Sequence, residues 1–257
     1  MNKKFLYIAN WKMNMPFSNV TKFLNSSYNN LILLANQHSI ILCPSFTELP
    51  FCHEKLKNSS ISLAAQDCSP HSLGAYTGDI SAENLKEHYV SFCLLGHSER
   101  RLYHKETDSI IAQKAIQLFN NDINPILCIG ETKEIVESGK TISFLEKQLS
   151  SFLDVIIQLH KQSKIISNIY IAYEPVWSIG TGIIPKKEHL NTIFSWLSSH
   201  ITKQLKPIEI QPSIKLIYGG SVNPHNASLF KNHPFISGLL IGKASTDFQL
   251  FEKIVSL

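Results

Sequence analysis

The sequence of 257 residues predicts an α/β fold, a closed (β/α)₈ barrel that forms one single domain over residues 1–257. Three observations support this prediction. Short apolar runs recur along the whole chain, segments with helical spacing separate them, and Gly, Pro and polar residues cluster after the runs. The length also matches the roughly 250 residues that one barrel of this class occupies.

The apolar runs are the predicted strands. Each run is largely continuous instead of alternating, which is typical of parallel strands that are buried on both faces. The predicted strands are Phe5–Ala9, Ile40–Cys43, Ile61–Ala65, Val90–Leu95, Pro125–Ile129, Ile169–Tyr173, Lys215–Tyr218 and Ser237–Ile241. Between them, apolar residues at helical spacing predict helices, for example over Ser109–Phe119 and Ile142–Leu149. This repeated alternation within one domain favours a closed barrel over an open doubly wound sheet.

The residues that follow the strands identify the expected site. In a parallel barrel the C-terminal strand ends meet at one mouth, where active sites of this architecture are built. Polar, Gly and Pro residues gather at these positions: Asn10 and Lys12, Gln66, Gly96–Glu99, Gly130–Glu131, Glu174–Pro175, Gly219–Ser221 and Gly242–Lys243. We therefore expect residues that are distant in the sequence to become neighbours there.

The composition argues against several classes of partner. The chain carries 24 basic and 20 acidic residues, a net charge of +4, and the basic residues are scattered. A nucleic-acid partner is therefore not expected, whereas a small anionic substrate fits. No segment approaches the ~18 uninterrupted apolar residues of a membrane helix, and the apolar stretch Phe5–Ala9 is too short for a secretion signal. No membrane partner is expected.

The cysteines and histidines give no pattern that would suggest a metal site or redox chemistry. The five cysteines are an odd number without a C-x-x-C spacing that would suggest zinc or redox chemistry. We expect buried, reduced thiols and a cytoplasmic protein. The histidines show no metal-ligand spacing either, so no metal is predicted.

Glu174 is the candidate general base. It ends the apolar run Ile169–Tyr173 and precedes Pro175, whose ring disfavours helix at the preceding residue and keeps Glu174 extended at the strand tip. A carboxylate among apolar neighbours binds a proton more readily than one in water, which suits a general base. The segment taken alone also fits a helix-capping or salt-bridged glutamate.

The segment Pro175–Gly182 has an uncommon composition for a loop, since it combines Val176 and Trp177 with two glycines. Apolar side chains are useful if the loop covers a ligand and excludes water, and glycines can present backbone N–H groups to an anion. A loop packed permanently on the barrel rim is the alternative. The Gly-rich turns in Tyr218–Val222 and Ile241–Ser245 predict a phosphate site after strands seven and eight, although each turn alone is a weak signal.

Two further side chains belong to the predicted mouth. His97 follows a strand, and Ser98 is expected to cap a short helix with the imidazole at its N-terminus. The positive end of that helix dipole disfavours imidazolium and leaves a neutral ring that can donate a hydrogen bond. Lys12, two residues beyond Asn10, places a cation at the mouth. Taken alone, these residues also fit a surface histidine and a solvated lysine.

Four motifs together resemble the signature of the triosephosphate isomerase family, in its order and at its spacings over essentially the whole chain. They are Ala9–Asn14, Leu95–Arg101, Ala172–Gly182 and Tyr218–Val222. The resemblance implies a TIM barrel that interconverts dihydroxyacetone phosphate and D-glyceraldehyde 3-phosphate through an enediol(ate), in glycolysis and gluconeogenesis, and that requires no cofactor. Acid–base tuning and lid closure are well-known properties of this family and are inherited here from the resemblance.

The resemblance also implies roles for the matching positions. Glu174 would remove the proton alpha to the carbonyl, and neutral His97 would transfer protons between the two substrate oxygens. Lys12 would stabilise negative charge, and Asn10 would hold a substrate oxygen. The backbone N–H groups that would bind the phosphate are those of Gly180, Ser221, Gly242 and Lys243. A closed lid would keep water from the enediol phosphate, which otherwise eliminates phosphate.

The stretch Gln66–Gly78 resembles the protruding third loop of the family, which docks into the partner subunit beside its active site. The resemblance therefore implies a homodimer in which Thr77 approaches Asn10 and Lys12 of the neighbour. Monomers are expected to be inactive or nearly so.

The chain departs from the family pattern at three places. Lys243 stands where the family usually has Gly, so a side chain must fit beside the phosphate. Ser178 stands where Ala is common. The exit hinge of the lid is Ile183–Pro185, in which Pro185 fixes φ and stiffens the backbone.

Two other hypotheses remain at this point. A different phosphate-binding barrel, such as a tetrose phosphate isomerase or a biosynthetic isomerase, would share the turns after strands seven and eight but would not require the joint set of motifs. A catalytically silent barrel that acts as a binding or surface protein would not require the expected residue type at every catalytic position.

Overall fold

The computed structural model describes residues 4–257; residues 1–3 of the predicted domain lie outside the described residues. Parallel strands close into a barrel in the order β1 to β8, with β8 paired to β1. The strands are β1 (Leu6–Asn10), β2 (Ser39–Cys43), β3 (Ser62–Ala65), β4 (Phe92–Leu95), β5 (Asn124–Ile129), β6 (Asn168–Tyr173), β7 (Ser213–Tyr218) and β8 (Ile236–Ile241). The predicted (β/α)₈ class is confirmed.

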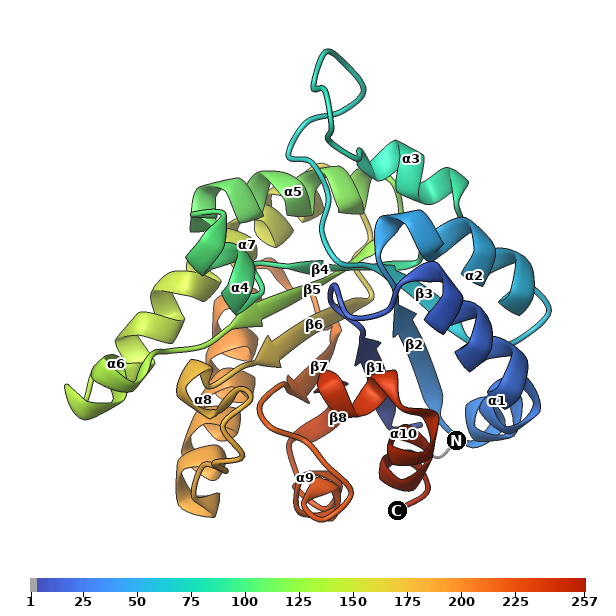
Figure 1. Ribbon diagram of the computed structural model, residues 1–257. Helices are drawn as coiled ribbons and strands as arrows, with labels where there is room; N and C mark the ends of the chain where they lie inside the picture. The colour runs from blue at the N-terminus through green and yellow to red at the C-terminus, as the bar shows by residue number, and fades with distance from the viewer. Residues whose placement is uncertain (1–3) are drawn as a thin grey trace.

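Helices surround the barrel and cover its outer face (Figure 1). They are α1 (Phe17–Gln37), α2 (Leu49–Leu56), α3 (Ala82–Glu87), α4 (Ser98–Tyr103), α5 (Asp108–Asn120), α6 (Lys133–Glu137), α7 (Thr141–Lys161), α8 (Lys187–Leu205), α9 (Ala227–Lys231) and α10 (Phe248–Val255). The helix predicted over Ser109–Phe119 is confirmed as α5. The one predicted over Ile142–Leu149 is the first part of the longer α7.

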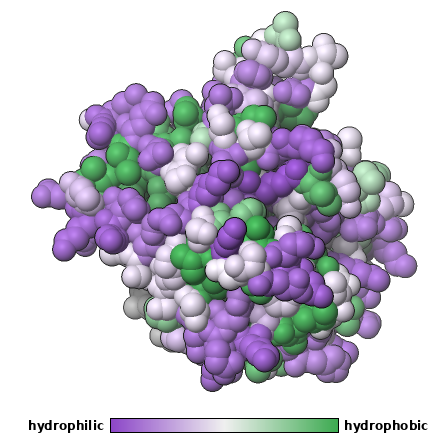
Figure 2. All heavy atoms as spheres, turned by 90° about the vertical axis from the view of Figure 1, so that its left-hand side faces the viewer, coloured by the Kyte–Doolittle hydropathy of each residue, from purple (hydrophilic) through white to green (hydrophobic). Residues whose placement is uncertain are grey.

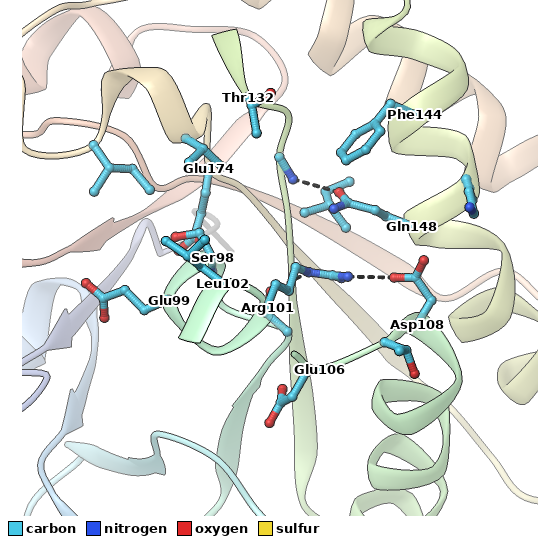
Figure 3. Close-up of a pocket in the computed structure, with 17 residues that line it drawn as sticks. Ser98, Glu99, Arg101, Leu102, Glu106, Asp108, Thr132, Phe144, Gln148 and Glu174 are labelled. Carbon is cyan, nitrogen blue, oxygen red and sulfur yellow. Dashed lines mark hydrogen bonds and ion pairs between the residues drawn. The ribbon is translucent and has the colours of Figure 1, made fainter. Parts of the chain in front are cut away.

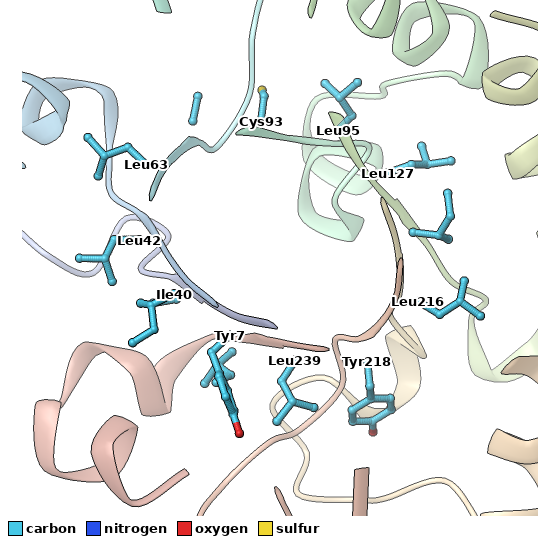
Figure 4. Packing of buried hydrophobic residues seen from close by; sticks show 14 of the residues in the cluster. Tyr7, Ile40, Leu42, Leu63, Cys93, Leu95, Leu127, Leu216, Tyr218 and Leu239 are labelled. Atoms are coloured by element: carbon cyan, nitrogen blue, oxygen red, sulfur yellow. The ribbon is translucent and has the colours of Figure 1, made fainter. Parts of the chain in front are cut away.

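Each strand buries both of its faces, as its continuous apolar sequence predicts. In β1, Tyr7 and Ala9 belong to the large cluster between strands and helices, whereas Leu6 and Ile8 belong to a smaller cluster inside the barrel. Figure 4 shows the outer set, with Tyr7 and its counterparts on the other strands pointing away from the barrel axis. A residue's position along a strand therefore decides whether its side chain reaches the barrel interior.

The segment between β3 and α3 extends away from the barrel (Figure 1). Residues 71–79 are all exposed, including the apolar side chains of Leu73 and Tyr76. In the space-filling view, where apolar and hydrophilic side chains alternate over most of the face, this projection stands clear of the rest of the surface (Figure 2). Its base is fixed, because Ser69 Oγ donates to Asp79 Oδ2 at 2.7 Å and Ser69 N–H donates to Ile80 O at 2.8 Å.

Two simpler expectations concern the described residues as a whole. All five cysteines are free and buried, as predicted. Within residues 4–257, none of the helices combines the length and the apolar character needed to cross a membrane.

Candidate active site

Successive side chains of β6 point alternately outward and into the barrel, and this alternation directs Glu174 into the barrel mouth. Tyr170 and Ala172 face the barrel interior, and Glu174 is the next residue of the same parity. The Glu174 N–H donates to Ile129 O at 2.7 Å, which extends the strand pairing with β5 by one residue. The side chain is almost completely buried, with only 2% of the residue exposed. Strand geometry thus places a carboxylate where few water molecules reach it.

Two glycines make room for Glu174: Gly130 for its backbone and Gly219 for its side chain. A Cβ on Gly130 would lie 1.7 Å from Glu174 O, and a Cβ on Gly219 would lie 2.8 Å from Glu174 Cγ. Neither position tolerates a side chain without displacing Glu174. Beneath the carboxylate lies the thiol of Cys128, whose pKa is raised well above its usual value by burial and by the charge of Glu174. The thiol therefore stays protonated below the Glu174 carboxylate.

His97 follows the end of β4 and faces Glu174, which follows the end of β6. The predicted cap at Ser98 is wrong: Ser98 is the first residue of α4, and His97 itself occupies the N-cap position. Its Nδ1 accepts a hydrogen bond from the Glu99 N–H at 3.3 Å, because an N-cap side chain satisfies the free N–H groups of the first turn. An accepting Nδ1 assigns the proton to Nε2 in a neutral ring. This Nε2 lies 3.3 Å from Glu174 Oε1.

The start of α4 contacts the carboxylate a second time. The Ser98 N–H donates to Glu174 Oε2 at 3.3 Å. One end of a helix therefore offers both the His97 imidazole and a backbone donor to the same carboxylate. Figure 3 shows Ser98 beside Glu174. The structure brings His97 and Glu174 next to each other.

Lys12 adopts a backbone conformation that is unusual for a residue with a side chain, with φ of 49°. Its N–H donates to Asn10 Oδ1 at 3.1 Å, and its carbonyl accepts from Gln66 Nε2 at 2.8 Å. These bonds hold the left-handed conformation in place, as is common where strain serves a site. The ammonium forms a 2.6 Å ion pair with Glu99 Oε1 on α4.

The segment Pro175–Gly182, which we call the lid, is anchored at its entrance by an aromatic cluster. Trp177 Nε1 donates to Glu131 Oε1 at 3.0 Å, and Tyr173 OH donates to the same oxygen at 2.9 Å. Glu131 is fully buried. Burial, followed by the charge of Glu131, raises the pKa of Tyr173 well above its usual value, so this hydroxyl remains a donor.

The other end of the lid is tied to the turn after β7. Ser221 Oγ donates to Ser178 O at 2.6 Å and accepts from the Gly182 N–H at 3.3 Å. Ser178 Oγ donates to Ile183 O at 2.6 Å and lies 3.5 Å from Tyr218 OH. Burial raises the pKa of Tyr218 to about 12. Ser178 therefore links the lid to its exit hinge through a hydroxyl that an alanine would lack.

The predicted phosphate-binding groups belong to the lid and to the turns that follow β7 and β8. Gly242 lies beside the stem of Lys12, since a Cβ on Gly242 would be 3.7 Å from Lys12 Cε. Within residues 4–257, no acceptor is recorded for the backbone N–H groups of Gly180, Ser221, Gly242 and Lys243. We call these four groups the cradle. The Lys243 side chain is exposed.

Behind α4 lies a buried cluster of charges, which we call the ion network: Asp67, Arg100, Glu106 and Lys114. Lys114 Nζ lies 2.6 Å from Asp67 Oδ1 and 2.5 Å from Glu106 Oε1. Arg100 completes the network with contacts of 2.7 Å to Asp67 and 2.6 Å to Glu106. The network connects the base of the protruding loop to α4 and α5. It fixes the helix that carries His97.

The comparisons with known proteins agree with this geometry. A family model described as triosephosphate isomerase matches residues 5–257. The chain belongs to the triosephosphate isomerase family. The triosephosphate isomerase of Aquifex aeolicus is 37% identical over 250 residues, which cover 97% of this chain and 98% of that protein. That of Dictyoglomus thermophilum is 38% identical over 255 residues, which cover 99% of each.

Membership in the triosephosphate isomerase family confirms the resemblance found in the sequence. The chain is an isomerase that interconverts triose phosphates, a reaction of glycolysis. Among the described residues, no group of His, Cys, Asp and Glu side chains is arranged to hold a metal ion.

Sequence reasoning missed several groups that this triosephosphate isomerase family member places in the site. Glu99, the partner of Lys12, stands 87 residues away in the chain, and no local pattern signals such a pair. Glu131 accepts a hydrogen bond from Trp177 of the lid, but the sequence marks it only as a polar residue that follows a strand. The spatial need for Gly130 and Gly219 has a weak signal, because glycines that directly follow buried strands often mark close approach.

Proposed function

We propose that Glu174 is the base that removes the proton from the carbon next to the substrate carbonyl. The observation that carries the proposal is the contact of 3.3 Å between Glu174 Oε1 and His97 Nε2 in a buried mouth. A carboxylate held beside a neutral donor can take a carbon-bound proton while the donor polarises the carbonyl. The resulting species is an enediolate.

His97 then carries protons between the two substrate oxygens. Its Nε2–H gives its proton to one oxygen, which leaves an imidazolate, and the imidazolate Nε2 then takes the proton from the hydroxyl on the other oxygen. The α4 N-terminus favours this cycle because it disfavours the imidazolium form and stabilises the anion. Lys12 stabilises the negative charge of the enediolate, and Asn10 orients a substrate oxygen from the same strand end. A charge-assisted donor of this kind is worth about 3 kcal/mol in the transition state.

The phosphate group is held by the cradle of Gly180, Ser221, Gly242 and Lys243. Backbone N–H groups without an internal acceptor are suited to a dianion, particularly where Gly-rich turns lead into helices. One cradle group belongs to the lid, so phosphate binding and lid closure support each other. A closed lid excludes water and so protects the enediolate from losing phosphate.

The functional unit is a homodimer formed through the loop around Thr77. The loop exposes Leu73 and Tyr76, and Met13 next to Lys12 is 94% exposed. Exposed apolar side chains on an ordered projection fit a protein interface. A Thr77→Arg variant should sediment as a monomer and lose nearly all activity. A fully active monomer would contradict the dimer proposal while leaving the chemistry intact.

The cellular setting follows from the same chemistry. Five buried thiols without a disulfide suit a reducing compartment, so we place the enzyme in the cytoplasm, as one barrel domain with a small-molecule substrate and with neither a nucleic-acid nor a membrane partner.

A coupled assay with D-glyceraldehyde 3-phosphate tests the catalytic roles. The wild-type protein should turn over rapidly, and Glu174→Gln should lower kcat by at least about 10³-fold with an unchanged unfolding temperature. A matched control is Glu188→Gln, which alters an exposed carboxylate at the start of α8 and should leave kcat unchanged. An inactive wild type would contradict the function, and an active Glu174→Gln would contradict the base.

A further inference from the structure

A cavity of about 190 Å³, which we call the bottom cavity, lies at the end of the barrel opposite to the candidate active site. It is lined by residues at the beginnings of strands, among them Ser39 of β2, Ser62 of β3 and Lys215 of β7. The candidate catalytic residues belong to the other ends of the strands. The apolar cluster inside the barrel, which includes Ile8 and Leu94, separates the two ends.

The alternation of side chains along the strands turns polar groups into the bottom cavity. Tyr170 and Lys215 are paired neighbours on β6 and β7. They have the same parity as Ala172 and Ile217, which lie inside the barrel, so their side chains point into its lower end. Ser39 meets the same condition on β2. The beginnings of the strands therefore place polar side chains where their later residues place apolar ones.

The ionisable side chains with a positive form dominate this lining. Lys4, His38 and Lys215 line the cavity, and no carboxylate of the described residues does. The first acidic residue of the whole sequence is Glu48. The pKa of His38 is lowered, first by burial and then by the positive charges of Lys231 and Lys4. The charges of the lining thus favour a negative ligand over a positive or neutral one.

Hydroxyl groups of the lining are available to such a ligand. Within residues 4–257, the side-chain hydroxyls of Ser39, Ser62 and Tyr170 form no recorded hydrogen bond. Burial raises the pKa of Tyr170, so its hydroxyl keeps the proton that it can donate. Lys4 Nζ donates to Ala35 O at 3.3 Å, which uses one of the three hydrogens of an ammonium group. The lining therefore combines positive charge with several hydrogen-bond donors.

We propose that the bottom cavity binds a small tetrahedral oxyanion, with inorganic phosphate as the representative ligand. The hydroxyls of Ser39, Ser62 and Tyr170 donate to its oxygens, and Lys4 and Lys215 supply the compensating charge. The cavity exceeds many times the roughly 15 Å³ that one water molecule needs, so the ion enters with part of its hydration water. Binding here does not depend on the proposed function, because none of the groups proposed to hold the triose lines this cavity.

A phosphate titration at constant pH, followed by NMR of protein with ¹⁵N-labelled histidines, tests the site. His38 lines the bottom cavity and His97 lies in the candidate active site, so the two signals report on the two ends separately. The His38→Gln variant assigns the first signal. We expect that signal to shift with a dissociation constant on the order of 1 mM and to stay in place in sodium chloride of equal ionic strength. A shift of the His97 signal alone would overturn the proposal.

Charge variants test whether the lysines of the cavity hold the ion. Lys215→Met and Lys4→Met should each weaken the phosphate response of His38 about fivefold. Lys4 is exposed, so its variant should fold even if Lys215→Met does not. Lys215→Arg keeps the charge and should bind within about twofold of the wild type.

Lys161→Met is the matched control, because Lys161 is an exposed lysine at the C-terminal end of α7 and does not line the cavity. This variant should bind phosphate like the wild type. An equal His38 response in Lys4→Met, Lys215→Met and Lys161→Met would overturn the proposal, because the signal would then respond to the overall charge of the protein.

Inhibition kinetics separate this site from the cradle. Phosphate should compete with the triose phosphate at the cradle, a step that rests on the proposed function, and its inhibition constant should be the same in the wild type and in Lys215→Met. An inhibition constant that rises by the same factor as the His38 response weakens would overturn the bottom site, because one site would then explain both effects. A protein without isomerase activity but with the Lys215-dependent response of His38 would remove the proposed function and keep the site.

Discussion

The α4 side and the lid side of the mouth are built differently. On the α4 side, His97 sits at the N-cap of a helix that the buried ion network fixes from behind. On the lid side, Glu174 leads directly into a segment that is held mainly by hydrogen bonds of Glu131 and Ser221. The proposed acid–base pair therefore joins a fixed residue to one whose surroundings depend on the lid.

The two sides of the mouth meet two different requirements of the proposed reaction, a fixed proton donor and a segment that opens. Proton transfer requires a donor whose position and tautomer do not change, and charges buried together provide that rigidity. Exclusion of water requires a segment that opens for the substrate, and a few hydrogen bonds between loops provide that freedom. Substitutions on the α4 side should therefore affect stability most, and those on the lid side should affect turnover.

The largest effect is expected from Lys114→Met in the ion network. Removal of one cation leaves Asp67 and Glu106 buried with less compensation, which typically costs about 3–5 kcal/mol. Urea unfolding should show this loss, while kcat of the folded variant changes little. Lys203→Met, at an exposed site on α8, should stay within about 0.5 kcal/mol of the wild type. A similar stability for both variants would contradict the role of the network.

The pH dependence of that difference sharpens the test. Burial acts to lower the pKa of Lys114, but the charges and hydrogen bonds of Asp67 and Glu106 outweigh it, so the pKa is raised. A raised pKa stabilises the fold fully below the ordinary lysine pKa of about 10.4, and the stabilisation is lost as pH rises through the folded-state value. The gap between wild type and Lys114→Met should be constant from about pH 7 to 9 and should shrink only in strongly alkaline solution.

The second largest effect is expected from a change in the position of Glu174, the proposed base. Gly219→Ala brings a methyl group to 2.8 Å from Glu174 Cγ, which displaces the carboxylate from its position beside His97. We expect kcat to fall about 100-fold because small displacements of a catalytic group are costly, with a smaller change in KM. An unchanged kcat would show that the position of Glu174 tolerates displacement.

A smaller effect is expected for Ser178→Ala in the lid. The variant loses the hydrogen bond to Ile183 O, worth about 1 kcal/mol, so lid opening and kcat should change by a few-fold. Stopped-flow fluorescence of Trp177 with a substrate analogue would follow the lid directly. Ser199→Ala, an exposed serine on α8, is the control. Identical lid kinetics in both variants would mean that Ser178 does not control the hinge.

The smallest effect is expected for Lys243→Gly. The backbone N–H that the cradle uses is retained and only an exposed side chain is removed, so kcat should remain within about threefold of the wild type. Steady-state kinetics decide the matter. Complete loss of turnover would show that the ammonium takes part in catalysis.

The strand ends show what local sequence can predict. Seven predicted strands end at the residue where the structure ends them, from Cys43 to Ile241, because a buried apolar run stops abruptly at a polar residue, a glycine or a proline. The exception is β1, which continues to Asn10. A polar residue predicts the start of a loop, but the Asn10 side chain is buried and still belongs to the strand.

The predicted strand starts are less accurate than the predicted strand ends, because side-chain burial changes gradually along the first residues of each strand. Residues such as Ser39, Asn124 and Ser213 are polar and half-buried at the barrel bottom, yet they belong to strands. Burial there is graded and leaves no sharp signal. Contacts such as Lys12 with Glu99, or Trp177 with Glu131, follow from barrel closure and cannot be predicted from neighbouring residues.

The central claim is that Glu174, held beside a fixed His97, removes the carbon-bound proton. Incubation of dihydroxyacetone phosphate with the enzyme in D₂O, followed by proton NMR, measures that step directly. We predict rapid deuterium incorporation at the reacting carbon with the wild type, and a loss of exchange and isomerisation by the same factor of about 10³ or more in Glu174→Gln. Exchange at the wild-type rate in Glu174→Gln would contradict the account, because another group would then be the base.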